Sequence, residues 1–323
     1  MLGPEGPGRS TPMGGNTLAH ERRRYHRIRR LRRSRRGVAT VIGALLVVVI
    51  FVAVFGVFLT QTVPVWMNQN ETSWTNSAEQ SMASFKGDVD LQYSLGASPA
   101  YSVPFSLSSS GVPVLASPTQ GALVFVPGTT SSYANVSLSS GPDGAPYADN
   151  ASTGTLTMSL PNRYASPETL AFQNDAVIRV PNGANATIDF TPLFSLHRVA
   201  GNTSLALAVI ETVGGERSAN APGLQQVLST LLSRSTVTSH GAAGTNGTFQ
   251  PFGVTLRIGS AYACAWQAFL ADAVSDSGIA PGGYTLSGPS SGCAGTVLLT
   301  LSSVSYCTLY LADIDIAVGT GPA

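Results

Sequence analysis

The residues of this chain that could form a catalytic centre are few and scattered. Gly288-Pro289-Ser290-Ser291-Gly292 matches G-x-S-x-G, the nucleophile elbow of hydrolases, in which the serine stands between a strand and a helix. The elbow also needs a downstream Asp or Glu and then a His, but no histidine follows His240. A β-like segment, not a helix, follows the motif. We interpret it as a Gly/Ser turn.

The nearest acidic pair is Asp313 and Asp315, at alternate positions of a predicted strand and therefore on one face. Two carboxylates can act as general acid and base, but a solvated strand face is the favoured interpretation. The chain has neither the H-E-x-x-H motif nor a phosphate-binding G-x-x-x-x-G-K-[ST] loop. The sequence therefore predicts no catalytic, cofactor-binding or metal-binding residues, and no enzyme.

Three cysteines, Cys264, Cys293 and Cys307, leave one thiol unpaired if a disulfide forms. We favour Cys264–Cys293, because Cys293 lies in a Gly/Ser turn that can adapt to disulfide geometry. Metal binding is the alternative, but there is no Cys-x-x-Cys pair, and His197 and His240 are isolated.

The charges divide the chain into two opposed blocks. Residues 1–37 carry eleven Arg against two Glu, whereas residues 38–323 carry one Lys and six Arg against fifteen acidic residues. Only 11% of residues are charged, compared with about 25% in an ordinary soluble domain. Because the basic residues are confined to one end, the composition argues against a nucleic-acid partner.

Residues 38–59 separate the two blocks. They contain no charged residue, and Thr40 is their only polar side chain. A helix of this length spans roughly 33 Å, slightly more than the ~30 Å apolar layer of a membrane. The arginines precede it, and the first charge after it is Glu71. The positive-inside rule therefore predicts a single-pass protein of the cell membrane, with residues 1–37 cytoplasmic and residues 60–323 extracellular.

The junction before this helix reads Arg35-Arg36-Gly37-Val38-Ala39-Thr40-Val41-Ile42-Gly43. It resembles the class III signal peptide of archaeal type IV pilin-like proteins and archaellins. The resemblance covers about residues 35–60 and implies a prepilin-peptidase-like protease as a partner. Cleavage would follow Gly37, with Arg36 as the preceding basic residue and Val38 as the mature N-terminus. Many members have Ser-Pro where this chain has Ala39-Thr40, and translation starting at Met13 is an alternative to the long leader.

Beyond the membrane, residues 60–89 are predicted to form an amphipathic helix that ends near Gly87. Its apolar side chains fall at intervals of three, four and seven: Met67, Trp74, Ala78, Met82, Phe85 and Val89. The stripe could pack on the chain's own domain or against neighbouring subunits, and the sequence does not separate the two.

Residues 90–323 are predicted to form an extracellular, Gly/Ser/Thr-rich domain of antiparallel sheets arranged like a β-sandwich, so the fold class is α+β. Two short helices are expected, one around Leu224–Leu232 and one around Trp266–Val274. The predicted strands lie at 91–95, 103–107, 122–126, 156–160, 176–180, 186–190, 203–213, 252–258, 284–286, 295–301 and 304–317.

Six N-x-Ser/Thr sequons lie on the predicted outer side, a density that agrees with a glycosylated surface. The sequon at Asn70 is disfavoured, because it would sit in a helix close to the membrane. The remaining candidates for glycosylation are Asn135, Asn150, Asn185, Asn202 and Asn246.

The leading hypothesis is a pilin-like structural subunit, anchored by its apolar helix and able to assemble with identical or related subunits into a surface filament for adhesion or motility. A monomeric membrane-anchored glycoprotein or adhesin is the first alternative. An anchored extracellular hydrolase is the second, and the motifs of the chain support it poorly. The ligand of the outer domain is not encoded in any motif.

Overall fold

The computed structural model describes residues 17–96, 99–141, 144–199, 201–241 and 250–319, with side chains from residue 40 onward. The chain divides into two units, residues 1–62 and residues 63–323. The predicted domain boundary at 89/90 does not coincide with this division. Residues 63–89 instead belong to the same unit as the β-rich domain.

The long N-terminal helix, α1 (Thr17–Leu95), contains the apolar segment and continues through Pro64. It also continues past Gly87, so the helix end predicted there and the strand predicted at 91–95 are both wrong. The glycine in the left-handed conformation is Gly96, with φ +64°, and its N–H donates to the Gln92 carbonyl. Gly87 lies on an open side of the helix, where a Cβ would meet nothing.

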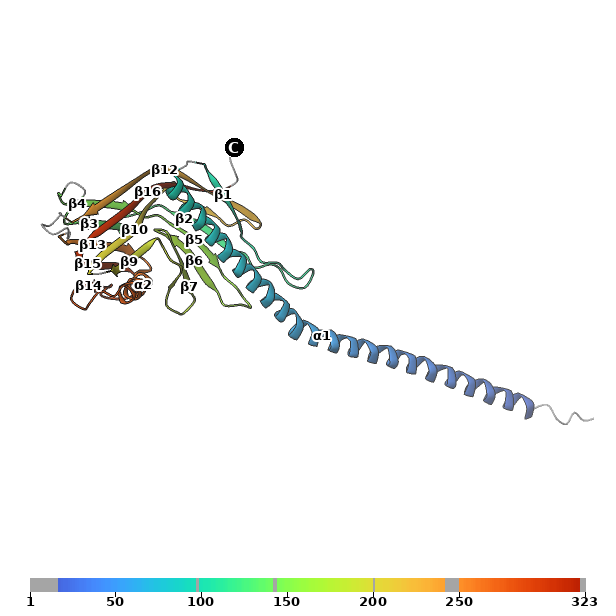
Figure 1. Cartoon of the computed structure of the whole chain (residues 1–323). Coiled ribbons are helices and arrows are strands. Elements are labelled where there is room, and N and C mark those ends of the chain that lie inside the picture. The colour runs from blue at the N-terminus through green and yellow to red at the C-terminus, as the bar shows by residue number, and fades with distance from the viewer. Residues whose placement is uncertain (1–16, 97–98, 142–143, 200, 242–249, 320–323) are drawn as a thin grey trace, which may run out of the picture. The chain divides into compact units, whose positions relative to one another are not determined.

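The described part of the second unit contains three sheets (Figure 1). The strands of the first sheet, in spatial order, are β1 (Tyr101–Ser106), β12 (Leu224–His240), β16 (Tyr306–Gly319), β10 (Asn202–Val213) and β9 (Phe194–Val199). Those of the second sheet are β11 (Arg217–Ala219), β2 (Ala122–Val126), β5 (Thr155–Leu160), β6 (Glu168–Gln173), β7 (Ala176–Pro181) and β8 (Thr187–Phe190). Those of the third sheet are β14 (Tyr284–Ser287), β15 (Gly295–Val304), β13 (Phe252–Ser260), β3 (Tyr133–Leu138) and β4 (Tyr147–Ser152).

The sheets are antiparallel with one exception, because β10 and β16 pair in parallel from Ser204↔Tyr306 to Val213↔Asp315. The expectation of purely antiparallel sheets is therefore wrong at this pair. About ninety residues separate the two strands in sequence, which is ample for the crossover that a parallel pair requires. Alternation of apolar and polar residues reports which face is buried and does not report strand direction.

The segment predicted as a helix around Leu224–Leu232 is instead the first half of strand β12. Its buried positions are Val227, Ser229 and Leu231, which alternate as a strand requires. The helix was predicted because five apolar residues in this segment fall at the spacing of a helix face. The continuation Ser-Arg-Ser-Thr-Val-Thr-Ser is poor in helix formers, and two neighbouring strands, β1 and β16, supply backbone partners.

The helix predicted around Trp266 is confirmed as α2 (Ala263–Asp276), and Trp266, Leu270 and Val274 are its large buried residues. The other predicted strands are also present, with bounds shifted by a few residues. Five short strands were not predicted: β3, β4, β6, β9 and β11.

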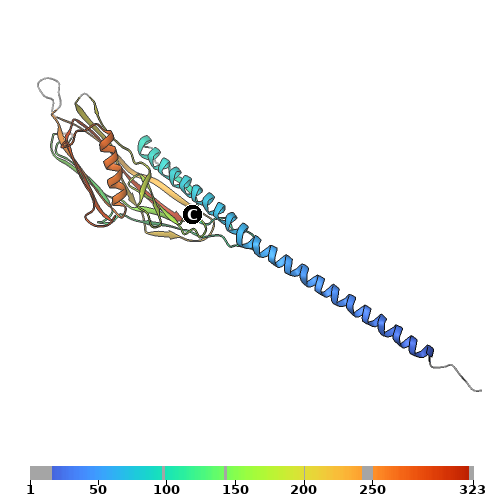
Figure 2. The same cartoon turned by 90° about the horizontal axis from the view of Figure 1, so that it is seen from below.

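Two clusters of buried apolar residues hold this unit together. One contains the apolar face of α2, which contacts β15, β13 and β14. The other contains the stripe of α1 and the facing residues of β1, β2, β5 and β6. In Figures 1 and 2 strands lie between α2 and the C-terminal part of α1, so each helix covers its own cluster.

Candidate functional site

The apolar segment of α1 is exposed around its whole circumference from Val41 to Val57, with Val47 at 66% and Phe51 at 67%. Its most apolar window has a mean hydropathy of 3.2 and no buried residue. Among the described residues, α1 is the one helix long and apolar enough to cross a membrane. Exposure of this kind is unfavourable in water, so the segment needs a lipid or protein environment.

The predicted cleavage site, Arg36, Gly37 and Val38, lies within α1, but its side chains are outside the described part of the chain. Nothing in the geometry tests the processing. It stays a prediction.

The stripe that follows, from Met67 to Val89, is buried against the chain's own β-rich domain. Phe85 is fully buried, and its ring meets Phe172 of β6 edge to face with a centroid distance of 5.0 Å. Trp74 donates its ring N–H to the Ser106 carbonyl at 2.7 Å. The sequence left open whether the stripe packs on the chain's own domain or against neighbouring subunits. In the structure it packs on the chain's own domain.

Within the described residues, three of the polar connections between α1 and the β-rich unit involve carboxylates, and Glu71 makes the first. Its carboxylate is fully buried and accepts the backbone N–H groups of Arg163, Tyr164 and Ala165 and the hydroxyl of Thr119. Burial alone would raise the pKa of Glu71, but the hydrogen bonds from Thr119 and the three backbone groups outweigh it and lower the pKa. The ionised carboxylate therefore holds the β5–β6 connection against the helix.

Arg179 of β7 makes the second connection. Its guanidinium pairs with Glu79 of α1, with Glu168 of β6 at 3.5 Å and with Asp189 of β8 at 2.5 Å. The side chains are 8–30% exposed, so water screens the network only in part.

Lys86, the only lysine of the chain, forms the third connection. Its Nζ lies 2.8 Å from Oδ2 of Asp90, one turn further along α1, and 3.3 Å from Oδ1 of Asp175, in the β6–β7 turn. The Tyr93 hydroxyl donates to Asp90. Asp175 is fully buried, and its other oxygen accepts the Leu193 N–H at 2.8 Å.

The environment of Asp175 favours its protonated form. Burial raises the pKa of this carboxyl well above its usual range, the hydrogen bond with Asp90 raises it further, and Lys86 opposes both. Sequence reasoning missed this cluster and the Glu71 connection. A single lysine inside an otherwise apolar helix stripe was the signal that could have pointed to the cluster.

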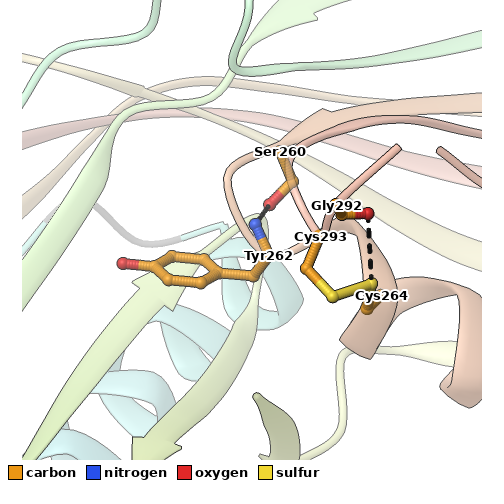
Figure 3. Close-up of a disulfide and its surroundings, with 5 residues drawn as sticks. All are labelled: Ser260, Tyr262, Cys264, Gly292 and Cys293. Carbon is orange, nitrogen blue, oxygen red and sulfur yellow. Dashed lines mark hydrogen bonds between the residues drawn. A yellow bond between two sulfur atoms is a disulfide. The ribbon is translucent and has the colours of Figure 1, made fainter. Parts of the chain in front are cut away.

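The residues of the predicted disulfide are joined in the structure (Figure 3): Cys264, at the start of α2, bonds to Cys293 in the β14–β15 loop. Cys264 Sγ also contacts the Gly292 carbonyl oxygen at 3.7 Å, and beside it the Tyr262 N–H donates to Ser260 Oγ. Cys307 is a buried free thiol, and burial raises its pKa to about 12. It is therefore a poor nucleophile at neutral pH.

The sequons differ in their surroundings. Asn185 is exposed between β7 and β8, and Asn202 is exposed at the start of β10. Asn135 and Asn150 face each other on β3 and β4, with Asn135 only partly exposed. Asn246 lies outside the described residues. The disfavoured Asn70 is partly buried, and its side-chain amide donates to the Ser110 carbonyl.

The G-x-S-x-G residues lie in the loop between β14 and β15, which pair as an antiparallel hairpin. Strand β15 follows the motif, so the helix that a nucleophile elbow needs is absent from this described segment. Asp313 accepts a hydrogen bond from Ser233 at 2.6 Å and stands opposite Glu211 in β10. Within the described residues, no group of His, Cys, Asp and Glu is arranged to hold a metal ion.

Comparison of the chain with protein-family models, with curated proteins and with solved structures finds no match. Function must therefore be argued from the chain's own residues.

Proposed function

We propose that this chain is a pilin-like structural subunit of a cell surface. Its apolar helix anchors it in the membrane and then packs with the same helix of other subunits, and its β-sandwich-like domain faces outward as a glycosylated surface. The partners on this proposal are the membrane, a prepilin-peptidase-like protease and identical or related subunits.

The observation that carries the proposal is the fully exposed apolar segment from Val41 to Val57, on the same helix whose later turns are held to the β-rich domain. An apolar surface of this length must be covered by lipid or by protein. Three separate polar connections and the buried stripe make residues 63–95 an integral part of the outer domain. Such a domain would move with its helix when the helix transfers from lipid into an assembly.

A monomeric, membrane-anchored surface glycoprotein or adhesin is the second candidate. One observation favours it: the stripe from Met67 to Val89 is already buried within the subunit, so it leaves these apolar side chains unavailable to neighbouring subunits. Only the segment before residue 63 would then remain for assembly contacts.

Gly43→Leu separates the two candidates. A plain anchor should accept it, because the segment stays apolar and long enough to span. A packed helical core should not, since a leucine at a small-residue contact separates the backbones, and overpacking costs about 1–3 kcal/mol per site. Val47→Leu is the matched control, because it adds one methylene at a position that already carries a branched side chain.

The measurement compares the amount of each chain in the membrane fraction with the amount of high-molecular-mass material sheared from the cell surface. The pilin-like proposal predicts that Gly43→Leu keeps its membrane level and loses sheared material, while Val47→Leu keeps both. Equal sheared material from wild type and Gly43→Leu, or none from wild type, would favour the monomeric anchored protein.

A further inference from the structure

The surroundings of Lys86 contain the groups needed to form an amide between two side chains. An amine and a carboxyl group lie in contact, 3.3 Å between Lys86 Nζ and Asp175 Oδ1, and the carbon that would be attacked is bonded to that oxygen. A second carboxylate, Asp90, lies 2.8 Å from the same amine. Asp175 is fully buried, and Lys86 is 9% exposed.

We propose that Lys86 and Asp175 become joined by an isopeptide bond, with Asp90 transferring the proton. Nζ of Lys86 in its neutral form attacks Cγ of a protonated Asp175, and the N–C bond forms as Asp90 accepts a proton from nitrogen. Asp90 then returns that proton to the departing hydroxyl group of Asp175. The products are a side-chain amide and one water molecule, and no oxidant, reductant or other reactant is consumed.

The local geometry suits each step. The Lys86 amine lies against the Asp175 carboxyl group, with Nζ 3.3 Å from Oδ1, and this placement gives an effective concentration that free amines and carboxylic acids do not reach in water. The Leu193 N–H, 2.8 Å from Asp175 Oδ2, points at the oxygen on which negative charge would develop. Asp175 is fully buried, which shelters its reacting carbon from bulk water, whereas the Asp90 side chain is 40% exposed and gives the released water a way out. Burial and the hydrogen bond with Asp90 also raise the pKa of Asp175, which supplies the neutral acid.

Asp175 is presented by a two-residue hairpin turn. Asn174 and Asp175 form a tight connection between β6 and β7, and both have positive φ, +44° and +66°. Neither residue is glycine, and both are buried. Two backbone N–H groups fix the turn, Ile210 donating to Asn174 Oδ1 and Leu193 to Asp175. The Leu193 N–H therefore holds the reacting carboxyl itself, and the Ile210 N–H holds the neighbouring residue of the turn.

The bond would tie α1 covalently to the β-rich domain, between the fixed positions 86 and 175. This inference does not rest on the proposed function, since the cross-link could form in a monomer or in a filament subunit. The alternative is a buried, non-covalent network of Lys86, Asp90, Tyr93 and Asp175. Mass distinguishes the two, because only amide formation removes a water.

The test uses the full chain, expressed in a host that does not glycosylate it, unfolded, reduced at the Cys264–Cys293 disulfide and measured by intact mass spectrometry. The expected mass is lower than that of the encoded chain by one water. Trypsin should fail to cut after Lys86, and residues 164–179 should appear only in a branched peptide. Because Lys86 is the only lysine, the unfolded chain should show no reaction of a side-chain amine with an amine-directed reagent. The encoded mass with cleavage after Lys86 would overturn the proposal, as would a water loss mapped elsewhere.

Three variants sharpen the assignment. Lys86→Arg should keep its full encoded mass. Asp175→Asn should form the same bond with loss of ammonia, so its cross-linked chain should have the same mass as the cross-linked wild type. Asp90→Asn should slow the reaction by about 10²–10⁴-fold, the range for losing general acid–base catalysis, so freshly purified chain should be largely uncross-linked. Complete cross-linking of Asp90→Asn would overturn the role of Asp90, and cross-linking of Lys86→Arg would overturn that of Lys86.

Discussion

Two buried carboxyl groups at the contact between α1 and the β-rich unit, those of Glu71 and Asp175, have opposite ionisation tendencies, and their neighbours decide which form is stable. Glu71 and Asp175 are both fully buried. Glu71 receives three backbone N–H groups and a hydroxyl, which stabilise the anion, whereas Asp175 shares its site with a second carboxyl. Neither role could be predicted from sequence, because the partners lie between 18 and 94 residues away.

Glu71→Gln should lower the free energy of unfolding by about 1–3 kcal/mol, since an amide nitrogen would face buried N–H donors that then have no acceptor. This free energy is measured by urea unfolding of the full chain in detergent, with tryptophan fluorescence as the signal. Gln69→Glu exchanges the same two side chains at an exposed position of the same helix and should change stability by no more than about 0.5 kcal/mol. Equal effects of the two variants would contradict the connection described for Glu71.

The pKa of Glu71 fixes how the free energy of unfolding of wild type should change with pH relative to that of Glu71→Gln. The folded-state pKa of Glu71 lies below its ordinary value of 4.5, so its stabilisation is complete above that pH and is lost as the pH falls through the folded pKa. Wild type should therefore lose more stability than Glu71→Gln between neutral pH and about pH 3. Asp175 is unchanged in both chains, so the difference isolates Glu71. Parallel pH profiles would show that the carboxylate is not stabilised by folding.

Glycosylation is the third prediction at this scale. Asn185 is exposed between β7 and β8, whereas Asn135 is partly buried in β3, between β4 and β13. A glycan on chain purified from its native source should therefore occupy Asn185 in preference to Asn135. Glycopeptide mass spectrometry of wild type and Asn185→Gln measures the occupancy. A glycan on Asn135 beside an unmodified Asn185 would contradict the prediction.

At the scale of elements, local signals were reliable where one pattern dominated. The apolar run and the α2 stripe identified helices, and alternating residues located most strands. Such signals fail where two periodicities fit the same leucines, as at Leu228 and Leu231, which strand partners assign to β12. Local signals also fail at the end of α1, where the ending depends on Gly96 and on Arg234. Arg234 comes from β12 and donates to the Tyr93 and Ser94 carbonyls.

The contact between α1 and the sheets gives an element-scale prediction. Phe85→Ala should cost about 3–5 kcal/mol of unfolding free energy, because it leaves a cavity against Phe172 in a fully buried site. Leu91→Ala, on the same helix but 40% exposed, is the control and should cost less than about 1 kcal/mol. Denaturant unfolding of the full chain measures both. A small effect of Phe85→Ala would mean that α1 contributes little to the domain's stability.

At the scale of the whole molecule, the sequence predicted an apolar helix followed by a mostly β domain, and both are present. The division between them was not predictable in detail. The apolar run ends near residue 59, but the structural unit that contains the sheets begins at Val63 and includes the last turns of α1. The spacing of residues such as Met67 and Phe85 predicts that they share one face of a helix. Only the fold shows which surface that face packs against.

The pilin-like account depends on a retained apolar helix that becomes the N-terminus of the mature chain. The most direct measurement is the N-terminal residue of the chain isolated from the membrane fraction of cells that produce it, by mass spectrometry of terminal peptides. The account predicts Val38, with Gly37→Val blocking the cleavage and Arg27→Ala leaving it intact. A mature chain that begins at Met1 or Met13, or one that begins beyond the apolar segment, would contradict it.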